Sequence, residues 1–276
     1  MYDKSPHLPV VLAIGGHDPG GGAGIQADIE AIAANGCHAT TAVTCLTVQD
    51  SCNLSQLLPT DISILKDQIS ATLEDCRVAT IKIGLVGSLA AAEAIVETLR
   101  EHPKIPLVLD PVLAAGGGRD LSNRDLVEYL RHALIPLCRL LTPNTPEAAR
   151  LAGLDLLRDY QVAADRLLEL GTDAVLITGS HDPQPGEEIV HRLYQPSTPP
   201  MLSRWQRLRG EFHGSGCTLT SAIAARMAQQ ESLETAVEQG LAYTWSAISN
   251  GFKTGRCQAI PERLLRLQRG HRDGEK

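Results

Sequence analysis

The chain has 276 residues, of which 43% are hydrophobic and 21% charged, a composition typical of a folded globular protein. The net charge of −7 and the aromatic content of 3% argue against a basic nucleic-acid surface or a base-stacking platform, so we expect neither nucleic acid nor a membrane as a partner. The length suits one domain over residues 1–276, with a polar tail at about 270–276.

The cysteines point to a reducing compartment. There are seven of them, an odd number, and no C-x-x-C pair, so neither a disulfide framework nor a cysteine zinc site is indicated. Reduced thiols predict a cytoplasmic protein. The apolar run from Leu8 to Ile14 is too short for a signal peptide, and no apolar stretch is long enough to cross a bilayer.

Short apolar runs alternate with helical patterns along most of the chain. Strands are predicted at residues 10–14, 40–46, 80–83, 107–109, 140–141 and 174–177. Helices are predicted near residues 24–35, 60–75, 88–101, 122–134, 146–153 and 158–170. This alternation predicts an α/β fold whose central, mostly parallel sheet is flanked by helices on both faces.

The last third of the chain breaks this alternation. Residues 188–194 and 202–208 predict a β-hairpin joined by a proline-rich loop. After it come a helix that starts at the sequence Gly-Ser-Gly-Cys, a helix over 233–249 and a final helix over 261–269.

A glycine-rich segment, residues 15–28, follows the first predicted strand. Gly22, Gly24 and Ala27 match a G-x-G-x-x-A dinucleotide fingerprint. Seven residues separate Ile14 from Gly22, however, whereas in a true fingerprint the strand leads straight into the first glycine. Nicotinamide binding is therefore disfavoured, and the absence of G-K-[ST] excludes a Walker A loop.

A second glycine segment, Gly214-Ser215-Gly216-Cys217, leads into a helix rich in small residues. The first N–H groups of a helix lack intrahelical partners and carry a positive partial charge, so this segment predicts an anion site. A thiol there tends to have a lowered pKa, which makes Cys217 a candidate base or nucleophile. The alternative is a helix start in which Cys217 is a small buried hydrophobic residue.

Polar residues follow two further strands. Asp110 ends one of them, and Asn144 and Glu147 follow the next, where open α/β sheets bind ligands. Asp110 and Glu147 suit Mg²⁺ held mainly through water. Alternatively, Asp110 is a turn residue and Glu147 an acid at a helix N-terminus. The histidines lack metal-ligand spacing and are predicted to be turn or surface residues.

Six motifs in register resemble the hydroxymethylpyrimidine/phosphomethylpyrimidine kinases of thiamine biosynthesis, in the ribokinase-like superfamily. They are G-G-H-D-P-G-G-G-A-G-I-Q-A-D at 15–28, T-V-Q-D at 47–50, K-I-G-L at 82–85, D-P-V-L at 110–113, T-P-N-T-P-E at 142–147 and H-G-S-G-C-T at 213–218. The resemblance covers nearly the whole chain. It implies a ribokinase-like fold, a homodimer, and two ATP- and Mg²⁺-dependent phosphorylations of a small pyrimidine.

The same resemblance implies roles for individual residues. Gly214, Ser215, Gly216 and Cys217 would form the anion hole, with Cys217 as the base of the first step. Gln49 would bind the aminopyrimidine in a pocket completed by Asp28, Ala23, Leu85 and Val112. Asn144 and Glu147 would serve the ATP phosphates and Mg²⁺, with Asp110 near the metal. Thr178 stands in the ATP site near the place where relatives commonly carry lysine, and Leu85 stands where methionine is usual.

Two other functions stay open at this point. A pyridoxal-type kinase would share the fold and the type of acceptor group. A pyrimidine-binding regulator without catalysis would keep the pocket, and the Thr178 departure is its only support in the sequence.

Overall fold

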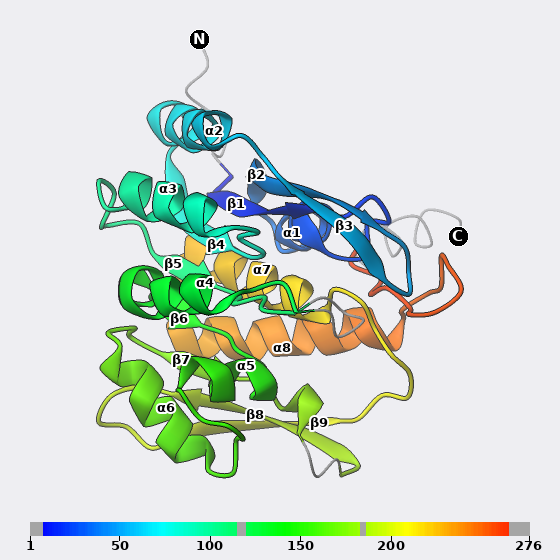
Figure 1. Ribbon diagram of the computed structural model, residues 1–276. Coiled ribbons are helices and arrows are strands. Elements are labelled where there is room, and N and C mark those ends of the chain that lie inside the picture. The colour runs from blue at the N-terminus through cyan, green and yellow to red at the C-terminus, as the bar shows by residue number, and fades with distance from the viewer. Residues whose placement is uncertain (1–7, 115–119, 183–185, 265–276) are drawn as a thin grey trace.

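The computed structural model describes residues 8–114, 120–182 and 186–264. Within these ranges, one nine-stranded sheet has the order β3-β2-β1-β4-β5-β6-β7-β8-β9 (Figure 1). Its strands are β1 (Val10–His17), β2 (His38–Gln49), β3 (Leu54–Pro59), β4 (Val78–Ile83), β5 (Leu107–Leu109), β6 (Leu140–Leu141), β7 (Val175–Ile177), β8 (Glu188–Tyr194) and β9 (Met201–Gln206). Neighbours from β2 to β7 run parallel, whereas β3, β8 and β9 pair antiparallel at the two edges.

Helices cover both faces of the sheet (Figure 1). They are α1 (Gly24–Ala34), α2 (Ile62–Asp75), α3 (Leu89–Leu99), α4 (Arg124–Tyr129), α5 (Thr145–Leu151), α6 (Tyr160–Glu169), α7 (Ser215–Ala228) and α8 (Leu233–Ser249). Helices α2 to α6 pack on one face, and α1, α7 and α8 pack on the other. Within the described residues, none of these helices combines the length and apolar character that crossing a bilayer requires.

The side chains of β1 show why its sequence is a continuous apolar run. Leu12 and Ile14 join the core beneath α2 to α6, whereas Val11 and Ala13 join the core beneath α1, α7 and α8. All four side chains are fully buried. A central parallel strand is covered on both faces, so the alternation of polar and apolar residues seen in half-exposed strands is absent.

The predicted α/β class and the mostly parallel sheet are confirmed, and every predicted strand is present. Edge strand β3 was missed. The second strand of the hairpin covers Met201–Gln206 instead of 202–208, and the helix predicted over 122–134 is α4 followed by a π-helical turn over Leu130–Leu134. The helix predicted over 261–269 is wrong for 261–264, which are irregular at 261–262 and a turn at 263–264; its remainder and the tail at 270–276 lie outside the described residues.

Candidate active site

A cavity of about 610 Å³ lies where the parallel strands end at their carboxyl side. This is the place where open α/β sheets bind ligands, because loops after neighbouring strands converge there. Every residue predicted for the site lines it, although the segments come from all parts of the chain. These residues are Ala23, Asp28, Gln49, Leu85, Asp110, Val112, Asn144, Glu147, Thr178, Gly214, Ser215, Gly216 and Cys217.

The predicted anion hole is the first turn of α7. Gly214 precedes this helix in the left-handed conformation, with φ at +78°. Its carbonyl oxygen accepts hydrogen bonds from the backbone N–H of Thr218 at 2.9 Å and from the Thr218 hydroxyl at 2.8 Å. The N–H groups of Ser215, Gly216 and Cys217 have no acceptor within the helix. The turn thus offers several donors and the positive end of a 14-residue helix to one part of the cavity.

Cys217 lies in this turn, but its predicted pKa shift is wrong in sign. Burial raises the pKa of the thiol to about 12, although the charge of Lys82 acts in the opposite direction. The thiol hydrogen-bonds to the carboxylate of Asp110, and the backbone N–H of Gly24 also bonds to its sulfur. Desolvation therefore outweighs the attraction of Lys82, and Cys217 is a neutral thiol at neutral pH.

A buried ion pair forms the floor of the cavity. The Nζ of Lys82, on β4, lies 2.7 Å from Oδ1 of Asp28, on α1, and neither side chain is exposed. The hydroxyl of Ser221 donates to the same Oδ1 at 2.8 Å. Burial alone would lower the pKa of Lys82, but the charge of Asp28 raises it, so Lys82 stays a cation. Asp28, predicted as a polar contact in the substrate pocket, fixes the position of Lys82, whose role was not predicted.

Asp110 and Glu147 place two carboxyl groups in the cavity. Burial raises the pKa of Asp110 to about 6, against the lowering effect of Lys82. Burial and the charge of Asp110 raise the pKa of Glu147 to about 8. Glu147 also forms a capping box with Asn144 at the start of α5, with N···O distances of 2.9 and 3.0 Å. The alternative structural role of Glu147 is therefore real, and it coexists with a place in the cavity wall.

These two carboxyl groups fit a magnesium ion. Two like charges in a buried site disfavour each other, and a divalent cation nearby would remove that cost. In the described part of the chain, no cluster of three or more His, Cys, Asp or Glu side chains is suited to hold a metal ion. An ion bound at Asp110 and Glu147 would therefore keep water or phosphate oxygens as most of its ligands, which is the usual mode for Mg²⁺.

The remaining predicted residues form the walls. Gln49 ends β2 and is half-buried, and its side chain makes no hydrogen bond to any other described residue. Leu85 and Val112 follow β4 and β5 and supply apolar surface. Thr178 follows β7, and its N–H donates to the carbonyl oxygen of Pro143 at 2.9 Å, which places it beside Asn144 in the wall.

Asp18 and His213 connect the two glycine segments, a link that was not predicted. Asp18 accepts hydrogen bonds from the N–H groups of Gly20 and Ala23, both at 2.8 Å. Nε2 of His213 lies 3.1 Å from Oδ2 of Asp18. Burial would raise the pKa of Asp18, but these hydrogen bonds and the nearby histidine lower it to about 2. An aspartate followed by a proline and a run of glycines was the only sequence signal for this role.

The lowered pKa of Asp18 predicts a pH-dependent contribution to stability. Its folded-state value of about 2 lies below the ordinary value of 3.8, so the contribution is fully present above pH 4 and is lost as the pH falls towards 2. The difference in unfolding free energy between wild type and Asp18→Asn should be about 1–2 kcal/mol larger at pH 5 than at pH 2.5. Urea unfolding across this range measures it. A difference that does not change with pH would contradict the pKa.

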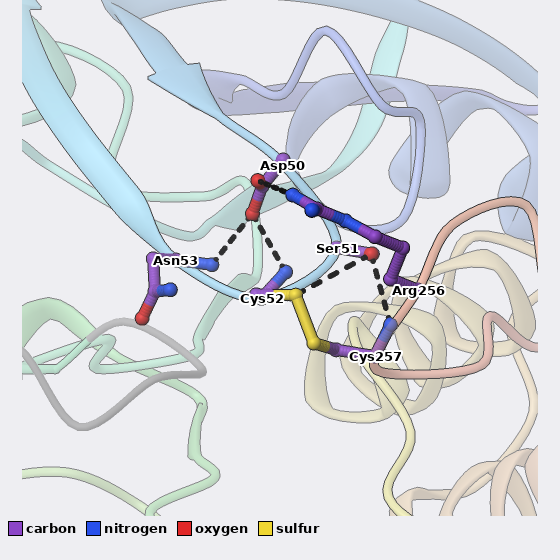
Figure 2. Close-up of a disulfide and its surroundings, with 6 residues drawn as sticks. All are labelled: Asp50, Ser51, Cys52, Asn53, Arg256 and Cys257. Carbon is purple, nitrogen blue, oxygen red and sulfur yellow. Dashed lines mark hydrogen bonds and ion pairs between the residues drawn. A yellow bond between two sulfur atoms is a disulfide. The ribbon is translucent and has the colours of Figure 1, made fainter.

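A disulfide next in sequence to Gln258, which lines the cavity, overturns the prediction of seven reduced cysteines. Cys52, in the turn between β2 and β3, is bonded to Cys257, which lies after α8 and 205 positions along the chain (Figure 2). Ser51 reinforces the junction by accepting from the N–H of Cys257 at 3.2 Å, and Asp50 pairs with Arg256 at 3.6 Å. The other five cysteines are free. The argument from reduced thiols to the cytoplasm therefore no longer holds.

Reduction of this disulfide should destabilise the fold. Because the bond closes a loop of 205 positions, breaking it restores much conformational freedom to the unfolded chain, and we expect a loss of about 2–4 kcal/mol of unfolding free energy. Denaturant unfolding with and without a thiol reductant measures the loss. The Cys52→Ser/Cys257→Ser double variant is the control, because its stability should not respond to the reductant. An equal response in both proteins would show that the reductant does not act through this disulfide.

The sequence matches a known family over most of its length. The profile of the phosphomethylpyrimidine kinase family (Phos_pyr_kin) matches residues 18–261. The chain is 33% identical over 250 residues to the hydroxymethylpyrimidine/phosphomethylpyrimidine kinase of Haemophilus influenzae, covering 89% of this chain and 93% of that protein. It is also 33% identical to a putative kinase of the same name from Schizosaccharomyces pombe, covering 96% of this chain but only 52% of that longer protein.

Solved structures show the same fold. The ADP complex of Bacillus subtilis pyridoxal kinase superposes with a TM-score of 0.87 at 28% identity, over 94% of this chain and 99% of that one. Phosphomethylpyrimidine kinase from Clostridium difficile superposes with a TM-score of 0.75 at 31% identity, over 87% and 99%. The fold and the sequence match together place this chain in the phosphomethylpyrimidine kinase family, with a ribokinase-like fold.

Proposed function

We propose that the protein uses ATP to phosphorylate the hydroxymethyl group of 4-amino-5-hydroxymethyl-2-methylpyrimidine, and then phosphorylates the monophosphate to the diphosphate, as in thiamine biosynthesis. The observation that carries this proposal is that Gln49 and the anion hole at Gly214–Cys217 line the same cavity. Gln49 would recognise an aminopyrimidine, and the anion hole would stabilise a transferring phosphoryl group. Membership of the family supports the same activity.

The acceptor would bind beside Gln49. Its amide offers both a donor and an acceptor, which an aminopyrimidine edge requires, and it has no other side-chain partner among the described residues. Leu85, Val112 and Ala23 would enclose the ring with apolar surface. Leucine in place of the usual methionine keeps volume and polarity, so Leu85 should change the pocket little.

Phosphoryl transfer depends on positioning and charge stabilisation more than on covalent chemistry. The N–H groups of the first turn of α7 would stabilise the transferring group. Asn144, Glu147 and Thr178 would bind the ATP phosphates, and Asp110 and Glu147 would hold Mg²⁺. Bound Mg²⁺ neutralises charge on the phosphate oxygens. Lys82, paired with Asp28, adds an ammonium group in the floor of the same cavity.

The first step needs a proton acceptor, since an alcohol has a high pKa. A thiol with a pKa of about 12 is a weak base candidate by itself, whereas Asp110, with a pKa of about 6, is ionised at neutral pH. We therefore assign the role of proton acceptor to the hydrogen-bonded pair of Cys217 and Asp110. Cys217 would contact the hydroxymethyl group, and the proton would end on the Asp110 carboxylate, which would hold Mg²⁺ through bound water and not as a direct ligand. A monophosphate is already ionised near neutrality, so the second step needs no base.

A pyridoxal kinase is the second candidate, favoured by the close superposition on the Bacillus subtilis enzyme. The two functions separate when kcat/KM is measured with ATP and Mg²⁺ on the pyrimidine alcohol and on pyridoxal. We expect the pyrimidine to be preferred. A preference for pyridoxal would replace the proposed function, and no turnover of either compound would favour a non-catalytic pyrimidine-binding regulator.

A further inference from the structure

Arg263 is a fully buried arginine outside the cavity lining. It lies in the turn after α8, and its side chain has no exposed surface. Its backbone is held in place, since the hydroxyl of Tyr243 donates to its carbonyl oxygen at 2.8 Å. The family match ends at residue 261, two positions before this arginine. A buried guanidinium must be paired and hydrogen-bonded to offset its loss of hydration, so its partners indicate what it does.

The guanidinium joins both glycine segments. Nη1 donates to the carbonyl oxygen of Gly21 at 3.2 Å, and Nη2 donates to that of Gly22. Nε donates to the hydroxyl of Thr218, in the first turn of α7, at 2.8 Å. Nη1 also pairs with Glu30, on α1, at 3.0 Å. One rigid, planar group thus ties the loop between β1 and α1 to the N-terminus of α7.

These contacts lie directly behind the anion hole. The hydroxyl of Thr218 that accepts from Arg263 donates in turn to the carbonyl oxygen of Gly214. A β-carbon built on Gly214 would lie 1.9 Å from the carbonyl oxygen of Gly22 and 2.9 Å from Nη2 of Arg263. Carbonyl oxygens so close to an anion site would oppose a bound anion. Arg263 offsets that effect, because it saturates them and places a positive charge behind the turn.

We propose that Arg263 is a positioning residue that fixes the anion hole of α7 relative to the loop that holds the acceptor. The expected effect on kcat rests on the proposed function, whereas the expected effect on the position of the first turn of α7 does not. Arg263 does not contact substrate. It sets the distance between the two reacting groups, and a displacement of about 1 Å in such a site costs about 10²-fold in rate.

The test compares Arg263→Ala and Arg263→Lys with wild type. Lysine keeps the charge but cannot form the fork, so both variants should lose about 10²-fold in kcat for both phosphorylations, with each KM changed less than about threefold. Low concentrations of guanidinium ion should restore at least about tenfold of the kcat of Arg263→Ala, and equal sodium chloride should not. Unchanged kcat per folded enzyme, or a change in KM alone, would overturn the proposal.

Arg226 provides the matched control. It is a largely buried arginine at the other end of α7, paired with Glu231 at 3.3 Å. Arg226→Ala should lower stability without the kcat loss or the guanidinium rescue. A second readout needs no substrate: amide hydrogen exchange at the hydrogen-bonded N–H groups of 20–23 and of Thr218 should rise in Arg263→Ala and not in Arg226→Ala. If the wild-type protein phosphorylates only pyridoxal, or neither pyridoxal nor the pyrimidine alcohol, the proposed function fails. Amide hydrogen exchange then still tests the role of Arg263. Unchanged exchange at both places would overturn it.

Discussion

Replacing Gly214 with alanine is expected to lower kcat of both phosphorylation steps by about 10²- to 10³-fold. Gly214 has φ at +78°, a conformation that costs an L-residue about 1–2 kcal/mol. Its added β-carbon would also lie 1.9 Å from the carbonyl oxygen of Gly22, so the backbone must move. That movement displaces the N–H donors of the first turn of α7, on which both steps depend. Steady-state kinetics of each step, resolved by product, measure the effect.

Gly36 separates this effect from the general cost of alanine in a left-handed conformation. Its φ is +80°, but the nearest atom to an added β-carbon is 3.9 Å away, and it does not line the cavity. Gly36→Ala should therefore lower the melting temperature and leave kcat unchanged. If Gly214→Ala also affected stability alone, the first turn of α7 would not be the anion hole.

The Cys217→Ala variant is expected to slow the first phosphorylation by about 10²-fold or more and the second by much less. The thiol hydrogen-bonds to Asp110, so its removal breaks the path from the acceptor hydroxyl to the carboxylate. The second acceptor is already an ionised phosphate and needs no such path. Rates of monophosphate and diphosphate formation, each started from its own substrate, give the two losses separately.

Asp110→Asn and Cys138→Ala complete this comparison. Asparagine removes the carboxylate and should reduce the first step at least as much as Cys217→Ala does. Cys138 is a buried thiol that does not line the cavity, and its variant controls for the loss of buried volume. Equal losses in both steps for Cys217→Ala would contradict its role in proton transfer.

The parts of the fold that depend on local sequence pattern were predictable. β1 and β5 to β7 are covered on both faces, so their residues form short apolar runs between helical patterns. β3 escaped prediction because it is a half-exposed edge strand, and its place depends on pairing with β2. The segment 261–269 was predicted as a helix because its sequence has leucines at 264, 265 and 267, but at 263 the arginine side chain is held in the interior by the carbonyl groups of Gly21 and Gly22.

Sequence motifs predicted which residues line the site. They did not predict the properties of the site that depend on how deeply a side chain is buried. The thirteen predicted residues share one cavity because loops after parallel strands converge at one edge of the sheet. The pKa of Cys217 depends on its burial, which the helix-start pattern does not reveal. The pair of Cys52 and Cys257 joins positions 205 apart, and an odd cysteine count gave no signal for it. The sequence shows Lys82 as a lone charged residue in an apolar strand, but it does not indicate that Asp28 is its partner.

The most direct test of the proposed function is a time course of wild-type protein with ATP, Mg²⁺ and 4-amino-5-hydroxymethyl-2-methylpyrimidine, in which both phosphorylated products are resolved. The monophosphate should appear first and then be converted to the diphosphate, with one ATP consumed per phosphoryl group transferred. Failure to phosphorylate this alcohol, together with rapid phosphorylation of pyridoxal under the same conditions, would contradict the assignment.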